Sequence, residues 1–218
     1  MDSLSRVEMI AESLRRLTRY TMELVKQTGG LIAPEGGGAR ESAWSEIEKL
    51  EVLVEEIKNE VLTQALMLIA RNQPLGRELM LSQTILNAAY DAFRISRYCR
   101  ELARIDKILH PGPGLSGIPG LRDVFSLVER AVSLALNDLN DLEPNHAGEI
   151  DEIDKVVDEE YFKLLREINS REQVKSIEAF RLLAMRHIER IVDHTVYIEN
   201  SLRLTRAGGL HHPGEPQV

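Results

Sequence analysis

The spacing of apolar residues along the chain predicts an all-α protein. Apolar side chains recur at three- and four-residue steps from Leu4 to Leu24 and again from Trp44 to Leu68. That period is typical of amphipathic helices that bury one face. It continues through four further segments, so we expect six helices, the last four at about 74–109, 121–142, 148–169 and 170–206.

Glycine and proline mark the expected ends of these helices. The stretch 29–42 is rich in glycine and predicts a long loop, whereas Asn72-Gln73-Pro74 predicts a tight corner. Residues 110–120 hold three prolines and four glycines, so we expect no regular element there. The predicted organisation is therefore a first three-helix bundle at 1–109, a linker at 110–120, a second three-helix bundle at 121–207 and a flexible tail at 208–218.

The two halves of the chain resemble each other. With an offset of 103 residues, segment 46–51 lies over segment 149–154, apolar on apolar and acid on acid. The same offset places Glu51 over Asp154 and Glu55 over Asp158. With a shorter offset, Arg94-Ile95 lies over Arg190-Ile191. The predicted fold is thus two tandem, pseudo-repeated three-helix bundles, each antiparallel because its connections are short.

Composition narrows the classes of function. The 218 residues carry a net charge of -8, which argues against nucleic acid as a main partner because phosphate binding needs a basic face. Charges interrupt the apolar residues at the N-terminus, and no stretch is long enough to span a bilayer, so we expect a cytoplasmic protein. The single Cys99 suits a reducing compartment, and we expect it to fill a helix interface.

Four carboxylates form the strongest candidate site. Asp154 and Asp158 are four residues apart on one predicted helix, and Glu189 and Asp193 repeat that spacing on the next. Together they would offer a hard, oxygen-rich site for a divalent or iron-type metal ion such as iron, manganese, magnesium or zinc.

The competing interpretation is an ordinary solvated face. Asp193 with Arg190, and Glu189 with Arg186, could form surface ion pairs three residues apart. Glu189 and Asp193 also lie well away from the centre of the apolar stripe of their helix, so a shared metal site would lie at the bundle surface.

Other catalytic and cofactor motifs are missing from the sequence. It contains no GxGxxG, GKS or GKT, no HExxH, and no pair of Glu-x-x-His segments; Glu143 and His146 form a lone match in a loop. His211 and His212 could bind a metal loosely in the tail. We find no nucleophile with a matched base, and no enzymatic activity is predicted.

Two motifs resemble those of the PhoU family, the accessory regulators of phosphate-specific transport. The segment LIARNQP at 68–74 is similar to the family signature LLARxQP, and ERIVDH at 189–194 is similar to ERIGDH. The resemblance covers nearly the whole chain. It implies two stacked three-helix bundles, a cytoplasmic and often dimeric protein, and a metal site formed by Asp154/Asp158 with Glu189/Asp193.

The same resemblance implies a regulatory role. Such proteins act with a phosphate transporter ATPase and permease complex and a sensor histidine kinase to restrain phosphate uptake when phosphate is plentiful, and they reach the membrane only through these partners. The alternatives are a metal-dependent hydrolase or oxidase that uses the same carboxylates, and a plain helical dimerisation scaffold.

The chain departs from the family pattern in its first half. Phe93 and Arg97 stand where the family's second acidic motif has Glu and Asp, and Met80 stands where Arg is common. A cation at Arg97 would repel a metal ion. We therefore expect no metal site in the first bundle, although Glu51 and Glu55 remain.

Overall fold

The computed structural model describes residues 3–34 and 40–207, which contain helices and no strand. The elements are α1 (Ser3–Ile32), α2 (Arg40–Asn72), α3 (Arg77–Leu109), a short 3-10 helix η1 (Leu115–Gly117), α4 (Leu121–Asp141), α5 (Ala147–Asn169) and α6 (Ser176–Arg206). The predicted all-α fold class is confirmed. The predicted tail at 208–218, with His211 and His212, and part of the predicted loop at 29–42 lie outside the described residues.

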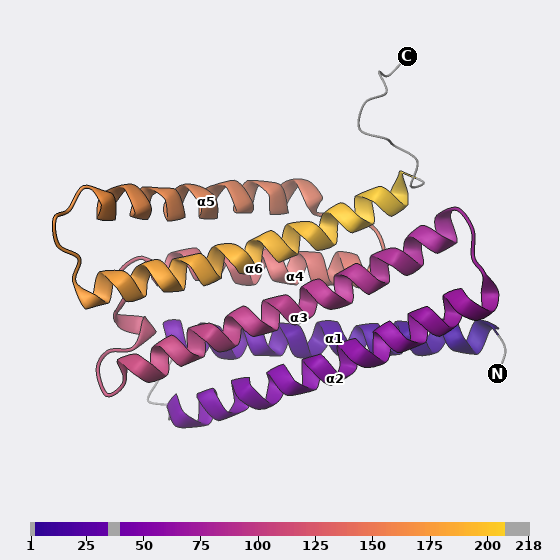
Figure 1. The fold of residues 1–218 in the computed structure, drawn as a ribbon, viewed down its shortest axis with the longest axis horizontal. Coiled ribbons are helices and arrows are strands. Elements are labelled where there is room, and N and C mark those ends of the chain that lie inside the picture. Colours follow the sequence, from indigo (N-terminus) through magenta and orange to yellow (C-terminus); the bar gives the residue numbers. More distant parts are fainter. Residues whose placement is uncertain (1–2, 35–39, 208–218) are drawn as a thin grey trace, which may run out of the picture.

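The helices pack in two groups of three. Helices α1, α2 and α3 contact one another, and so do α4, α5 and α6. The groups lie side by side, with α3 along α6 as the most extensive contact of any pair and α1 along α4 as a second contact (Figure 1). One hydrophobic core runs through all six helices, so the two bundles are joined by a packed interface in addition to the linker.

Several helix ends differ from the predicted ones. Helix α1 continues through Gly29 and Gly30 to Ile32, because Leu31 and Ile32 are buried and their burial outweighs the low helix propensity of glycine. Helix α3 begins at Arg77 instead of residue 74, and Gly76 precedes it with a positive φ of 56°. Helix α6 begins at Ser176 instead of residue 170.

The start of α6 has a local cause. The Lys175 amide donates to the carboxylate of Glu178 over 2.9 Å, which satisfies a backbone donor at the helix start. The expected helical turn at 170–175 is absent because the chain reverses direction there between α5 and α6 (Figure 1).

The proline- and glycine-rich linker is more ordered than predicted. It contains η1, and the side chain of Leu115 is fully buried. The Asp106 carboxylate at the end of α3 accepts hydrogen bonds from the Leu115 amide over 2.7 Å and from the indole of Trp44 over 2.9 Å. Arg40 Nη1 lies 3.6 Å from the same carboxylate. This network ties the linker to the ends of α2 and α3.

Two further predictions concern the burial of Cys99 and helices that could span a membrane. Cys99 is fully buried in the core, which confirms its place in a helix interface, and burial raises the pKa of its thiol to about 12. Among the described residues, none of the helices combines the length and apolar character needed to cross a bilayer.

Candidate functional site

The two predicted carboxylate pairs lie on neighbouring antiparallel helices. Asp154 and Asp158 belong to α5, and Glu189 and Asp193 belong to α6, which packs along α5 (Figure 1). Burial raises the pKa of Asp154 to about 6, and the charges of Asp158 and Asp193 add to the rise. The carboxylates of the two helices therefore interact with one another, and we call the surface between α5 and α6 that carries these four residues the α5–α6 groove.

The structure corrects one expectation about this site. Glu189 was expected at the bundle surface, but it is only 9% exposed. Burial is the main cause that raises its pKa, and the charge of Asp193 adds to it. The guanidinium of Arg186, which pairs with Glu189, also stands 5.6 Å from the centre of the Tyr161 ring of α5, so the Arg186 side chain lies across the contact between α5 and α6.

Two arginines of α6 balance the negative charges of Glu189 and Asp193. Arg186 Nη1 donates to Glu189 over 2.6 Å, and Arg190 Nη1 donates to Asp193 over 3.1 Å. The second oxygen of Glu189 is buried without a hydrogen bond. Within residues 3–34 and 40–207, no group of three or more His, Cys, Asp or Glu side chains is arranged so that it could hold a metal ion. The donor chemistry fits a hard cation, but the arginine pairs must open before the carboxylates can converge on one.

The corresponding groove of the first bundle is neutralised by the protein's own cations. Glu51 is buried and pairs with Arg100 Nη1 at 3.1 Å and with Arg97 Nη1 at 3.6 Å. Glu55 lies 3.9 Å from the ammonium of Lys58. Arg97, which stands where the PhoU pattern has an acid, thus pairs directly with Glu51, one of the two acids that remain in this bundle.

One hydrogen bond between the bundles was not predicted from the sequence. His194, the last residue of ERIVDH, turns toward α3, where its Nδ1 lies 2.8 Å from a carboxylate oxygen of Asp91. Its ring also stacks on Tyr98 of α3, with 5.7 Å between ring centres. The motif therefore serves two sides of α6: the acids face α5 and the histidine fixes the contact between bundles.

A buried acidic cluster was also missed. Asp138 of α4 is fully buried and accepts hydrogen bonds from the amide and the ring Nδ1 of His146, both over 2.6 Å. Glu199 of α6 is fully buried nearby, and burial together with the charge of Asp138 raises its pKa to about 8. The sequence held a signal, because Glu199 follows Thr195 by one helical turn and so falls on the buried side of α6.

The chain is similar in sequence to accessory proteins of phosphate-specific transport systems. No protein-family model matches the chain. It is 26% identical over 175 residues to the phosphate-specific transport system accessory protein PhoU homolog of Pseudomonas aeruginosa, covering 78% of this chain and 72% of that protein. It is 24% identical over 155 residues to the PhoU homolog of Synechocystis, covering 70% and 69%.

Solved structures agree with the fold. The crystal structure of PhoU from Pseudomonas aeruginosa superposes with a TM-score of 0.81 at 20% identity, covering 95% of this chain and 100% of that one. The phosphate transport system regulatory protein PhoU from Streptococcus pneumoniae gives a TM-score of 0.80 at 16% identity, covering 97% and 100%. At these identities the two structures support the six-helix arrangement.

Proposed function

Because the chain is a divergent member of the PhoU family, we propose that it is an accessory regulator of a phosphate transport system. The observation that supports this most is the extent of the sequence match: it covers 78% of this chain and 72% of the Pseudomonas aeruginosa protein, so it reaches into both bundles and is not confined to one motif. In this role the protein is a non-catalytic adaptor that restrains phosphate uptake when phosphate is plentiful.

The metal site belongs to the same proposal. Asp154 and Asp158 of α5 and Glu189 and Asp193 of α6 would hold a divalent or iron-type ion in the α5–α6 groove. Burial is the main cause that raises the pKa values of Asp154, Glu189 and Asp193, and repulsion from neighbouring acids adds to it. This supports the site, because a bound cation would favour the ionised form of these carboxylates. The ion would neutralise the groove and fix α5 against α6.

The proposed partners follow from the family. They are the transporter ATPase and permease complex, a sensor histidine kinase and a second copy of the chain. Membrane association occurs through these partners only, and the protein works in the cytoplasm.

Metal content tests the proposed site. The purified protein is loaded with manganese or iron, desalted and analysed by mass spectrometry, beside Asp154→Ala, Asp193→Ala and the exposed control Asp123→Ala. We expect bound metal in the wild type and the control and at least about a tenfold weaker affinity in the two site variants. Equal metal content in all four proteins would contradict the site.

Phosphate physiology tests the regulatory role. In the source organism, deletion of the gene should give high phosphate uptake and high alkaline phosphatase activity in phosphate-replete medium, and the wild-type gene should reverse both. Affinity capture from phosphate-replete cells should recover a transporter ATPase or a sensor kinase. Unchanged uptake and phosphatase activity in the deletion strain would refute the regulator.

A further inference from the structure

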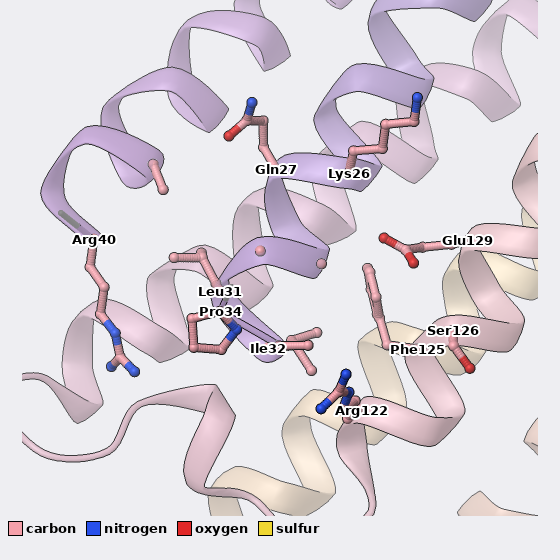
Figure 2. Close-up of a pocket in the computed structure, with 14 residues that line it drawn as sticks. Lys26, Gln27, Leu31, Ile32, Pro34, Arg40, Arg122, Phe125, Ser126 and Glu129 are labelled. Carbon is pink, nitrogen blue, oxygen red and sulfur yellow. The ribbon is translucent and has the colours of Figure 1, made fainter. Parts of the chain in front are cut away.

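A cavity unrelated to the carboxylate site opens where the two bundles meet. It has a volume of about 560 Å³ and lies between the end of α1, the start of α2 and the first half of α4 (Figure 2). That volume is in the range of small-molecule sites. No residue of α5 or α6 lines it, so its chemistry is independent of the proposed metal site.

Positive charge gathers around this cavity although the chain as a whole is acidic. Lys26 of α1, Arg40 of α2 and Arg122 of α4 line it, and among the described residues Glu129 of α4 is the acid that lines it. In Figure 2, Arg122 stands on one side of the cavity, and Glu129 and Lys26 stand on another. Arg40 pairs with the buried carboxylate of Asp106, and Lys26 lies beside Glu129. Among the described residues, the positive charge left without an acidic partner at the cavity is therefore that of Arg122.

The cations differ in how they are held. Arg40 is fixed at the rim, because its Nη2 donates to the carbonyl of Pro113 over 2.8 Å and to the hydroxyl of Ser116 over 2.9 Å. Arg122 is exposed and makes no hydrogen bond or ion pair within the described part of the chain. Its guanidinium carries five N–H donors in a planar fork that matches the geometry of a phosphate.

The floor of the cavity is kept open by glycine. A Cβ built on Gly30 would meet nothing within 4 Å, so the position faces open space. A Cβ on Gly29 would come within 2.2 Å of a Glu129 oxygen, so Gly29 allows that carboxyl to approach α1 closely. Glu129 thereby presents a hydrogen-bond acceptor opposite the arginine side of the cavity.

We propose that this cavity binds a phosphomonoester, with the phosphate on Arg122 and an O–H or N–H group of the organic part donating to Glu129 on the other side. Arginine forms a bidentate pair with phosphate. The volume is larger than a bare phosphate ion needs, and the apolar side chain of Ile32 lines the same cavity, which suits an organic part. This assignment does not rest on the proposed regulatory function.

Calorimetric titration of the full chain tests the proposal with defined probes. Adenosine monophosphate and glucose 6-phosphate are compared with adenosine, glucose and inorganic phosphate alone. We expect at least one of the two esters to bind at millimolar concentration or tighter and its dephosphorylated form not to bind. Failure of both esters overturns the proposal, and inorganic phosphate binding as tightly as either ester overturns its organic part.

Two variants locate the binding. Arg122→Glu should weaken ester binding at least about tenfold, whereas the exposed control Arg19→Glu on α1, with the same charge change, should not. Gly30→Leu should block binding while leaving thermal stability equal or higher, because leucine favours the helix and fills open space. Unchanged binding in Arg122→Glu and Gly30→Leu would show that the ester binds elsewhere and overturn the assignment.

Discussion

Glu199 should make the stability of the protein fall as the pH rises. Its carboxyl is fully buried in α6, and its pKa is raised from 4.5 to about 8 by burial and by the charge of Asp138, while Arg203 opposes the shift. The other titratable groups around it are Asp151 of α5 and His146, which is hydrogen-bonded to Asp138. At neutral pH the folded protein therefore holds Glu199 mostly protonated.

The sign and size of the effect follow from linkage. A carboxyl whose pKa is higher in the folded state binds its proton more tightly there, so the stability it contributes is complete below the unfolded pKa and is lost as the pH rises through the folded one. With about 1.4 kcal/mol per pKa unit, the loss between pH 5 and pH 8.5 is about 4 kcal/mol. Glutamine has the same shape and does not ionise, so Glu199→Gln should remove this dependence.

The assay is urea unfolding of both proteins at several pH values from 5 to 8.5. The stability difference between Glu199→Gln and wild type should grow in favour of the variant by about 4 kcal/mol across this range, because the other titrating groups are common to both proteins. The exposed control Glu159→Gln should show a constant difference. A difference that does not change with pH in Glu199→Gln would refute the buried protonated carboxyl.

Three other outcomes test the remaining contacts. Replacing Arg186 and Arg190 by alanine should strengthen manganese binding at least about tenfold in equilibrium dialysis, because both guanidinium groups compete with the ion for the acids. Asp106→Asn should cost about 2 kcal/mol in urea unfolding, since one of its two acceptor oxygens is lost. Arg97→Asp should not create a second manganese site, because Arg100 still pairs with the buried acid of that groove; a doubled metal stoichiometry would contradict this.

The fold was predictable because its signals are local. The apolar period is set by which residues face the core, and Pro74, Gly76 and the 110–120 linker interrupt it. The misplaced ends have a tertiary origin. Glycine propensity alone ends α1 near residue 28, but the buried Leu31 and Ile32 extend it by a further turn.

The site was predictable only in part. The spacing of four residues places each carboxylate pair on one side of its helix, and the antiparallel packing of α5 and α6 then brings the pairs together. Helical spacing places Glu199 on the buried side of α6, but neither the pairing of Asp91 with His194 nor the approach of Asp138 to Glu199 could be predicted from spacing alone. Both contacts depend on which helix lies opposite α6 at that point. Packing between segments far apart in the chain decides this.

The two bundles differ in how firmly their cations are held, and this difference decides where a metal ion can enter. Glu51 is almost completely buried, so removing its arginine partners would leave an unpaired buried charge at a cost of several kcal/mol. Arg190 and its partner Asp193 are 36% and 22% exposed, and solvent-accessible pairs of this kind contribute only about 0–1 kcal/mol. Arg100, the nearer partner of Glu51, is only 16% exposed. We therefore expect a divalent ion to displace Arg190 from Asp193 more readily than Arg100 from Glu51, which favours the second bundle for the proposed site.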